Sequence, residues 1–395
     1  MIGFGDPIRS ALAEGNELVF TAPFVNRWMP SRGADLRRPR PVSVAIQKHP
    51  DATADDAAVN AVRETLEAGE GALAMQNFCI RLKNPTLIGE RALIPCCSGV
   101  VITDSAHRYH TAEIYRSADR RDFEFLHLGF DGQSFFPTLG ADRLVHHEGS
   151  TALLASMEQG NYGAFLLRTV AKLAALRRLG IDPDRYFVST DASWQVRILE
   201  VFGVDSAKLL SYDRFKAHVF EDLYVPNLPT SEFVPDDMTI DFFVEVSERL
   251  KVSDLVTTRP SKIYVSRLRA ARERPHYRVC QNEAELVSRL RDFGFHIYEP
   301  ESDTIENQIR TFAAAEIVVG ASGAGMFNTI FCPPQTKIVS IEPMMNWTIL
   351  HANMYAGFGH PYVMVLGGAD PADSSSQRRW VADVELIIDQ IKSFM

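Results

Sequence analysis

The second half of the chain alternates short apolar runs with longer stretches of mixed polarity. Five runs rich in β-branched or aromatic residues have the length of buried strands: 263–265, 295–298, 317–319, 337–341 and 362–365. Five stretches place apolar residues three and four positions apart, which is the spacing of helices that pack on a sheet: 238–250, 282–293, 304–315, 347–356 and 379–394. This alternation predicts a parallel sheet covered by helices.

The first half begins with strands and then adopts the same alternation. Short apolar runs separated by turns predict a β-rich part between residues 77 and 130. From Ser150 the apolar spacing becomes helical, and Gly180 and Pro183 end that helical stretch. A strand, a helix and a strand then follow, at 186–188, 194–202 and 208–210. A second parallel sheet is therefore expected.

A proline-rich segment divides the two halves, because Pro226, Pro229 and Pro235 cannot continue a helix or a central strand. We therefore expect an α/β protein of two Rossmann-like lobes facing a cleft, with a β-rich N-terminal part. The expected divisions are a first lobe, a second lobe and a terminal helix that is able to pack back on the first lobe: residues 1–229, 230–378 and 379–395. Ligands of open α/β sheets bind in such a cleft.

One stretch of the second half has the residues of an anion site. The strand at 317–319 ends at Gly320, and Ser322-Gly323-Ala324-Gly325 then turns into an amphipathic segment. Glycine lets the backbone approach a ligand closely, and the start of a helix favours a phosphate. The next strand ends in Glu342, where a carboxylate can accept hydrogen bonds from ribose hydroxyls. A tight turn without a ligand is the alternative on these residues alone.

Two further residues belong to the same predicted site. The strand at 262–265 ends in Ser266-Arg267, whose planar guanidinium can make paired hydrogen bonds to a diphosphate. Asn328 lies in the first turns of the segment that follows the glycines. Further arginines follow Arg267, and one or two of them can complete a clamp, although a solvated basic loop is the plainer interpretation of each: Arg269, Arg272, Arg274 and Arg278.

The composition of the chain mainly excludes classes of function. A formal net charge of -9 argues against broad nucleic-acid binding. No apolar run approaches the roughly 18 residues that span a bilayer, and the first residues lack the pattern of a signal peptide. The five cysteines form no CxxC pair, which indicates reduced thiols. We expect a cytoplasmic protein without a transmembrane segment; peripheral membrane contact and the oligomeric state stay open.

Several familiar enzyme motifs are missing from the chain. HExxH, GxSxG and GxxxxGK[ST] do not occur. The glycines from Gly320 to Gly325 have the spacing GxxGxG rather than the dinucleotide spacing GxGxxG. Tyr212 and Lys216 imitate the dyad of short-chain dehydrogenases, but they precede the glycine turn instead of following it. An NAD-dependent oxidoreductase is therefore a weaker alternative.

The order of motifs between residues 262 and 342 resembles glycosyltransferase family 61, in its bacterial capsular and surface polysaccharide type. The residues that carry the resemblance are Tyr264-Val265-Ser266-Arg267, Arg278, Asn282-Glu283, Leu286, Gly294-Phe295, Gln308, Phe312, Ala315, Gly323-Ala324-Gly325, Asn328 and Phe331. Upstream, Asn161-Tyr162 before a leucine-rich helix resembles the family's N-Y-x-H-[WF] segment.

The resemblance implies a two-lobed GT-B fold and the inverting, metal-independent transfer of a sugar from a nucleotide-sugar donor to a saccharide acceptor. We expect a UDP-linked donor on the second lobe, the acceptor on the first, and no metal or other cofactor. The donor-binding residues would be Arg267, Ser322, Gly323, Ala324, Gly325, Asn328 and Glu342. The acceptor-side residues would be Asn161 and Tyr162.

Two positions depart from the family pattern. Ala164 and Ser322 stand where the pattern has histidines, yet an inverting transferase needs a base for the acceptor hydroxyl proton. Glu158 and Asp191 are the first-lobe carboxylates expected to face the cleft, so we expect the catalytic base among them; a helix cap is the plainer interpretation of Asp191. The alternative is a non-catalytic nucleotide-sugar-binding protein that acts as partner to an active transferase.

Overall fold

The computed structural model describes residues 17–20, 40–48, 50–51, 57–69, 78–88, 92–94, 101–102, 128–130, 135–137, 141–156, 158–226, 233–252, 258–343, 347–373 and 378–395. The chain divides into two compact units, each made of two segments. Unit 1 comprises Met1–Gly33 and Ala74–Ser231, and unit 2 comprises Ala34–Leu73 and Glu232–Met395. Most of the expected proline-rich linker, 227–232, lies outside the described residues.

Unit 2 contains a parallel sheet with the described strand order β14-β13-β15-β16-β17-β2. The strands are β2 (Ser43–Gln47), β13 (Lys262–Val265), β14 (His296–Tyr298), β15 (Ile317–Ala321), β16 (Lys337–Glu342) and β17 (Tyr362–Gly367). The helices are α2 (Ala57–Ala68), α8 (Asp237–Val252), α9 (Leu268–Glu273), α10 (Glu283–Asp292), η5 (Pro300–Ser302), α11 (Ile305–Ala313), η6 (Ala324–Phe331), α12 (Thr348–Gly357) and α13 (Val384–Phe394). The strands and helices expected in the second half are thus confirmed, except that η6 is a 3-10 helix and that the terminal helix begins at Val384 instead of Arg379.

The order of strands in unit 2 creates a topological switch point. From β13 the chain passes to β14 on one side, and then returns across β13 to β15 on the other side. The carboxyl ends of β13 and β15 are therefore neighbours at the place where the winding direction reverses. Open α/β sheets bind ligands at such a point.

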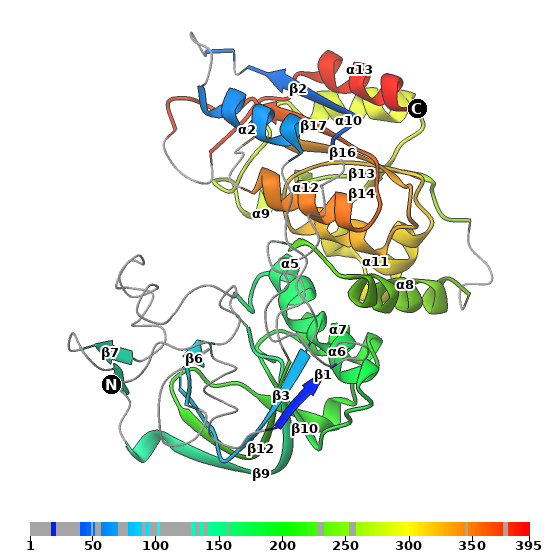
Figure 1. Ribbon diagram of the computed structural model, residues 1–395. Helices are drawn as coiled ribbons and strands as arrows, with labels where there is room; N and C mark the ends of the chain where they lie inside the picture. The colour runs from blue at the N-terminus through cyan, green and yellow to red at the C-terminus, as the bar shows by residue number, and fades with distance from the viewer. Residues whose placement is uncertain are drawn as a thin grey trace. The chain divides into compact units, whose positions relative to one another are not determined.

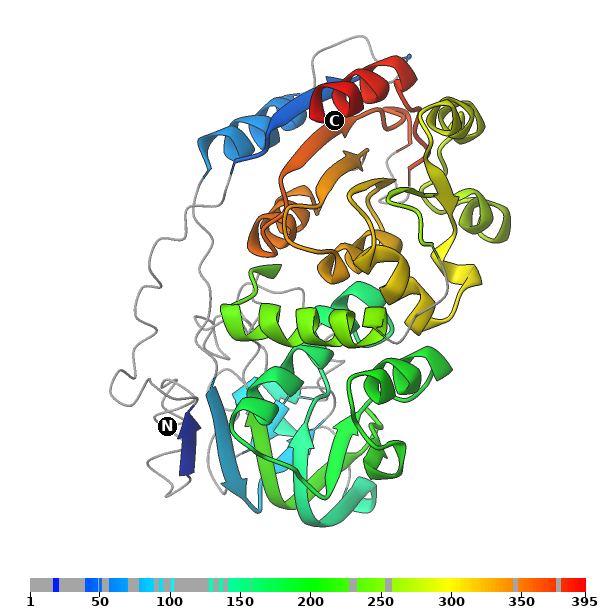
Figure 2. The same cartoon turned by 90° about the vertical axis from the view of Figure 1, so that its right-hand side faces the viewer.

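The N-terminal segment adds an edge strand and a helix to unit 2. β2 pairs with β17 in parallel, and α2 packs on β17, β2 and α12. Gln47 at the end of β2 is buried; its Nε2 donates to the Gly367 carbonyl at 2.8 Å, and its Oε1 accepts from the Asp383 amide at 2.8 Å. In Figure 1 the blue β2 and α2 lie close to β17 and the red α13, and Figure 2 shows the same grouping from the side.

This arrangement differs from the expected divisions of the chain in two places. The expected first lobe, 1–229, includes the segment Ala34–Leu73, which lies in unit 2 because β2 completes its sheet. The terminal helix was expected to be able to pack on the first lobe, whereas α13 lies in unit 2 and packs on α10, β2, β16 and β17. The apolar side of α13 joins the core cluster of that sheet.

Unit 1 contains a mixed sheet of nine described strands in which β12 is central. The strands are β1 (Glu17–Phe20), β3 (Phe78–Lys83), β4 (Thr86–Ile88), β5 (Ala92–Ile94), β6 (Val101–Ile102), β9 (Leu144–Leu153), β10 (Arg185–Val188), β11 (Leu209–Ser211) and β12 (Ala217–Pro226), and β7 (Leu128–Phe130) pairs separately with β8 (Phe135–Pro137). The helices are η1 (Ala141–Arg143), α5 (Tyr162–Ala164), the π-helix η2 (Phe165–Val170), α6 (Lys172–Arg178), α7 (Ser193–Val201) and η3 (Ser206–Lys208). Strands β9 to β12 are parallel in their described pairs, and the earlier strands pair antiparallel, so the expected β-rich start is confirmed.

The helical interpretation from Ser150 onward is wrong at its start. Residues 150–153 belong to β9, which lies between β10 and β12 and is buried at this end. The run Thr151–Ala155 is continuously apolar apart from its threonine, and a short buried run of this kind fits a strand or a helix equally well. The helical pattern begins only at Tyr162.

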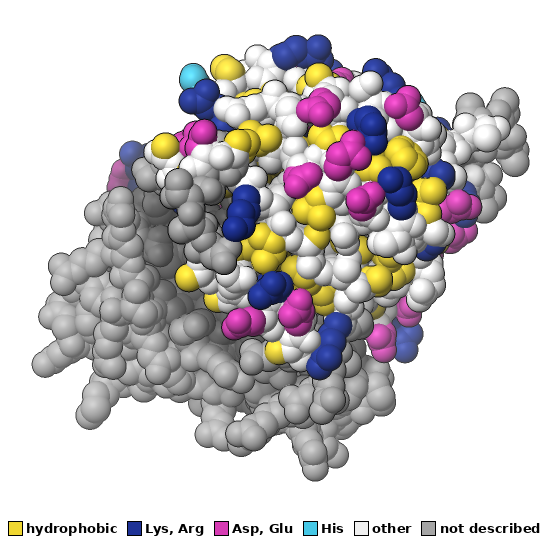
Figure 3. Space-filling view, turned by 90° about the horizontal axis from the view of Figure 1, so that it is seen from above, with side chains coloured by type: hydrophobic (Ala, Val, Ile, Leu, Met, Phe, Trp, Pro, Cys, Tyr) yellow, Lys and Arg dark blue, Asp and Glu magenta, His cyan; other side chains and the backbone are white. Residues whose placement is uncertain are grey.

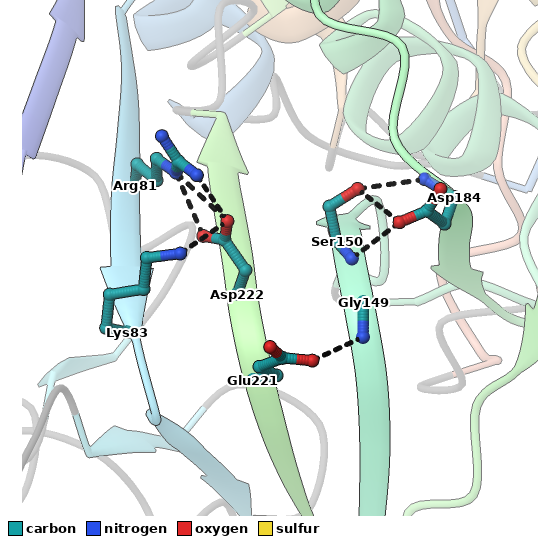
Figure 4. A network of polar contacts seen from close by, with 7 residues as sticks. All are labelled: Arg81, Lys83, Gly149, Ser150, Asp184, Glu221 and Asp222. Atoms are coloured by element: carbon teal, nitrogen blue, oxygen red, sulfur yellow. Dashed lines mark hydrogen bonds and ion pairs between the residues drawn. The ribbon is translucent and has the colours of Figure 1, made fainter.

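Polar contacts join three strands of unit 1 (Figure 4). Arg81 and Lys83 on β3 bind the buried carboxylate of Asp222 on β12, with ion-pair distances of 2.6 and 2.8 Å. Burial alone would raise the pKa of Asp222, but these two cations bring the net pKa below its ordinary value. On the other side of β12, Glu221 accepts a hydrogen bond from the Gly149 amide of β9 at 2.8 Å. The antiparallel strands are thereby tied to the parallel ones.

Candidate functional site

Arg267 and Gly323 meet at the switch point of unit 2. Arg267 lies two residues beyond β13, Gly323 two residues beyond β15, and Val265 pairs with Gly320 in the sheet. A Cβ atom added to Gly323 would collide with Nη1 of Arg267. The backbone of Gly323 is extended, with φ 160° and ψ 179°, which any residue adopts. Glycine is therefore needed here for the close approach of the guanidinium.

A buried carboxylate, that of Glu283, holds the backbone of Arg267 in place. Glu283 in the first turn of α10 accepts hydrogen bonds through Oε1 from the Arg267 amide at 2.7 Å, and from the hydroxyls of Tyr264 and Ser266, both at 3.1 Å. Burial raises the pKa of Glu283 despite these hydrogen bonds. The sequence pattern included Glu283 without giving it a role; its position in an acidic helix start sixteen residues after Arg267 was the available signal.

The guanidinium of Arg267 has few polar contacts among the described residues. Nη2 donates a long hydrogen bond of 3.4 Å to the Tyr277 carbonyl, and Nε is buried without a partner. Among the described residues no carboxylate forms an ion pair with it. Burial lowers the pKa of Arg267, and the nearby charge of Arg278 lowers it further. The charges of Glu283 and Glu301 offset this lowering only in part, and a partly buried guanidinium without an ion pair among the described residues favours the binding of an anion.

The turn from Ser322 to Gly325 supports the binding of an anion near Arg267 with some of its residues but not with all. The Ser322 amide donates to the Ile341 carbonyl at 2.8 Å and is not available to a ligand. Ala324 and Gly325 stand at the start of η6, where N–H groups lack partners within the helix. A Cβ on Gly325 would lie 2.8 Å from Cγ1 of Val265, so this glycine also serves close packing against β13.

Asn328, predicted to bind the donor, points into the interior of unit 2. It is completely buried, and its Nδ2 donates to Oε1 of Gln308 on α11 at 3.0 Å. Gln308 in turn donates to the Pro300 carbonyl at 2.8 Å. Asn328 thus joins η6 to α11, and this internal contact accounts for the asparagine of the family pattern. A contact between Asn328 and the donor stays a prediction.

Glu342 lies at the carboxyl end of β16, as expected, and is buried. Its Oε1 accepts from the Ser340 hydroxyl at 2.7 Å and lies 2.8 Å from Nδ1 of His351. The Tyr355 hydroxyl lies 3.1 Å from Oγ of Ser340 and extends this buried network. One carboxylate oxygen is therefore already used inside the protein, and ribose recognition by Glu342 stays a prediction.

The predicted acceptor-side residues begin the long helical segment of unit 1. Oδ1 of Asn161 caps α5 by accepting from the amides of Gly163 and Ala164 at 3.0 and 3.3 Å. Tyr162 packs against Trp194 of α7, with ring centroids 5.8 Å apart. Ala164 is only 2% exposed, so its side chain faces the interior. A π-helix follows at once, a local geometry that is frequent at functional sites.

Glu158 and Asp191 lie in loops that follow the adjacent parallel strands β9 and β10. Glu158 has a left-handed backbone, with φ 57°, and forms an ion pair with Nη1 of Arg168 at 2.7 Å. Asp191 is exposed and accepts a hydrogen bond from the Ser189 hydroxyl at 3.0 Å. The two predicted carboxylates are thus at the same edge of the sheet of unit 1.

Two buried glutamines join these loops. The amide of Ser189 donates to Oε1 of Gln159 at 2.9 Å. Nε2 of Gln195 donates to the Gln159 carbonyl at 2.8 Å and to the Ser189 hydroxyl at 3.1 Å. Gln195 therefore orients Ser189, which in turn orients Asp191. No sequence pattern predicted this network, because the two glutamines belong to no recognisable motif.

The part of the chain that the structure describes contains neither a candidate metal cluster nor a candidate membrane span. In these ranges no group of three or more His, Cys, Asp or Glu side chains is placed to hold a metal ion. No helix within them has the length and apolar character to cross a membrane. On the face seen in Figure 3, the described acidic and basic side chains are interspersed, and neither charge forms a continuous patch.

A parallel α/β unit that holds an arginine against a glycine turn at a topological switch point, with no ion pair to that arginine among the described residues, is typical of proteins that bind phosphorylated ligands. Residues 152–339 match the model of the family described as Glycosyltransferase 61, which confirms the resemblance. The matched region contains Asn161, Asp191, Arg267 and Gly323. The match indicates a glycosyltransferase, a class of enzyme with a sugar donor and an acceptor as substrates. No curated protein matches the chain.

Proposed function

We propose that this protein is an inverting, metal-independent glycosyltransferase of the GT-B type that moves a sugar from a UDP-linked donor to a saccharide acceptor in surface polysaccharide or glycan biosynthesis. The family match supports the reaction class. The observation that best supports a donor site is the close approach of the Arg267 guanidinium to Gly323 at the switch point of unit 2.

The proposed role of Arg267 is to bind the diphosphate of the donor. As the bond between the sugar and the diphosphate breaks, negative charge builds on the leaving nucleoside diphosphate. A guanidinium already fixed in place stabilises this charge without rearrangement. The amides of Ala324 and Gly325 at the start of η6 would add hydrogen bonds to the same phosphates. Arginine thus supplies the positive charge that a metal ion supplies in other transferases.

The proposed base is a carboxylate of unit 1. It would take the proton of the acceptor hydroxyl while that oxygen attacks the anomeric carbon from the side opposite the leaving group. Asp191 suits this role because Ser189 holds it through one oxygen while the side chain stays exposed. Glu158 is the second candidate; its carboxylate is already engaged in an ion pair with Arg168.

One observation favours a non-catalytic function. Ala164 stands at a histidine position of the family pattern, is buried and carries no titratable group. A protein that binds a nucleotide sugar without transferring it would keep Arg267 and Gly323 and lose the base. A third candidate, an NAD-dependent oxidoreductase, has no comparable support.

Thermal unfolding with added ligands separates these functions. A specific donor should raise the melting temperature with concentration, so we would screen UDP-, GDP-, CMP- and TDP-sugars and NAD. Arg267→Ala should abolish most of the shift, since a hydrogen bond to a charged group contributes about 1.5–3 kcal/mol. Arg269→Ala is the matched control, because Arg269 is already paired with Glu273. Stabilisation by NAD alone would reject the glycosyltransferase proposal, and binding without transfer to any acceptor would favour the non-catalytic function.

A further inference from the structure

Two partly exposed aromatic rings lie side by side in unit 1. Tyr162 is the first residue of α5 and Trp194 the second residue of α7, and their ring centroids lie 5.8 Å apart at an interplanar angle of 56°. The buried ring of Phe165 meets the Trp194 ring at 81°, with the centroids 5.2 Å apart. Both distances are within the range of favourable aromatic pairs. The indole is therefore held by the core while part of its surface stays exposed.

Polar groups accompany the two rings at the same edge of the sheet. β9 and β10 are parallel neighbours, so the segments that follow them, which lead to Tyr162 and to Asp191, begin at one edge. Asp191 is exposed, and the Ser189 hydroxyl engages one of its oxygens at 3.0 Å. The hydroxyls of Thr190 and Ser211, also 3.0 Å apart, lie next to the ends of β10 and the neighbouring β11. Aromatic rings with a few polar groups beside them are the usual lining of a small-molecule site.

Buried glutamines fix the two segments relative to each other. Oε1 of Gln159 accepts from the Ser189 amide at 2.9 Å, and Nε2 of Gln195 donates to the Gln159 carbonyl at 2.8 Å. Gln159 precedes Tyr162 by three residues, and Gln195 directly follows Trp194. The aromatic surface is therefore formed before a ligand binds, which lowers the entropic cost of binding.

We propose that Tyr162 and Trp194 form the stacking surface of an acceptor subsite, and that the acceptor is a pyranoside with an apolar face. Axial C–H groups on one face of such a sugar pack against the electron-rich face of an aromatic ring, while the hydroxyls at its rim form hydrogen bonds. One of these hydroxyls is then available to Asp191. Trp194 is outside the motifs that carry the family resemblance, and it acts here as a specificity-determining residue. The inference rests on the proposed function, in which the acceptor binds unit 1.

Ligand-detected NMR of the full chain tests the proposal, with methyl β-D-glucopyranoside and methyl β-D-galactopyranoside as probes. Saturation transferred from the protein should reach the ring C–H protons of at least one of them. Sorbitol has hydroxyls but no rigid apolar face, so it should bind about tenfold more weakly or less. Trp194→Leu should weaken pyranoside binding about tenfold because the aromatic face is lost. Trp194→Phe keeps such a face and should bind within about threefold of the parent.

Two comparisons separate stacking from packing. Trp194→Leu and Trp194→Phe both alter the contact with Phe165, so they should lose similar amounts of thermal stability, although only the leucine variant loses pyranoside affinity. Phe215→Ala is the matched control, because this 53% exposed aromatic residue lies just before β12, at the opposite edge of the same sheet, and should not affect binding.

Three results would contradict these proposals. Equal pyranoside affinity in Trp194→Leu and the parent would overturn the inference, and so would a parent that binds neither pyranoside. Both results leave the donor site intact, because nucleotide binding is measured separately. Pyranoside binding by a parent that binds no nucleotide sugar would instead overturn the proposed function and retain Trp194 in a saccharide site.

Discussion

The guanidinium of Arg267 occupies the space that a side chain on Gly323 would need. The two residues are far apart in sequence and meet only because β13 and β15 are adjacent in the sheet. One residue brings the positive charge, and the other leaves room for it and for a ligand beside the backbone. This pairing makes Gly323 a test of the site that leaves the arginine itself unchanged.

Gly323→Ala should displace the guanidinium of Arg267 and weaken nucleotide binding by about 10- to 100-fold, the effect of losing a charge-assisted hydrogen bond. The extended backbone of Gly323 accommodates alanine, so the melting temperature should change little. Calorimetric titration and thermal unfolding would measure the two effects. Gly320→Ala is the contrasting variant: its Cβ would lie 2.5 Å from Sδ of Met326 in the core, so it should mainly lose stability. Full nucleotide affinity in Gly323→Ala would show that the ligand lies elsewhere.

The five strands of unit 2 that lie in the second half of the chain could be predicted from sequence because each is a local apolar run. The strand β2 could not, since nothing local shows that Ser43–Gln47 pairs with a strand more than 300 residues later. The start of β9 was misjudged for a different reason, because a buried central strand has no alternation. Arg267 and Gly323 were each identified by motif, but their contact depends on strand order. The orienting role of Gln195 depends on tertiary hydrogen bonds alone.

Gln47→Leu should destabilise unit 2 by about 1–3 kcal/mol, because the Gly367 carbonyl and the Asp383 amide would both lose a buried partner. Urea unfolding would measure the loss. Lys48→Leu changes the neighbouring exposed residue and is the matched control. If Gln47→Leu unfolds at the same urea concentration as the parent, the N-terminal strand contributes nothing to the stability of this unit.

A histidine pair in unit 1 predicts a loss of stability in acid. Nε2 of His147 lies 2.9 Å from Nδ1 of His218, and Nε2 of His218 lies 2.9 Å from the Asp213 carbonyl. A carbonyl only accepts, so Nε2 of His218 carries a proton and Nδ1 accepts from His147. Burial, and then the neighbouring charge of His218, lowers the pKa of His147 to about 4. Burial also lowers the pKa of His218.

The lowered pKa values determine the direction in which the free energy of unfolding changes with pH. The unfolded chain binds these protons near pH 6.5, the ordinary pKa of histidine, and the folded chain binds them only at lower pH. This contribution to stability is therefore complete above about pH 6.5 and is lost as the pH falls toward 4. His147→Gln should flatten the decline in unfolding free energy between these values, and His146→Gln, on the exposed neighbour, should not. Equal slopes in the parent and in His147→Gln would show that the pair does not titrate in this way.

Restoring the family's histidine at position 164 is a poor test of catalysis. The side chain of Ala164 is buried, and an imidazole in its place would overpack the interior of unit 1. Loss of stability would then hide any gain in activity. The carboxylates that the structure leaves near the carboxyl ends of β9 and β10 give cleaner variants, because both are exposed.

Asp191→Asn should lower the turnover of sugar transfer by about 10²–10⁴-fold while leaving the affinity for the nucleotide nearly unchanged, as expected for a general base. Asparagine keeps an oxygen that accepts from the Ser189 hydroxyl, so the fold should be preserved. Ser189→Ala removes the group that orients Asp191 and should lower turnover by less, with recovery in Ser189→Thr. Glu158→Gln is the matched carboxylate control; it loses an exposed ion pair with Arg168 that contributes about 0–1 kcal/mol. Turnover measured at saturating donor decides among them: a large loss in Glu158→Gln alone assigns the base to Glu158, and full activity in both variants excludes both carboxylates.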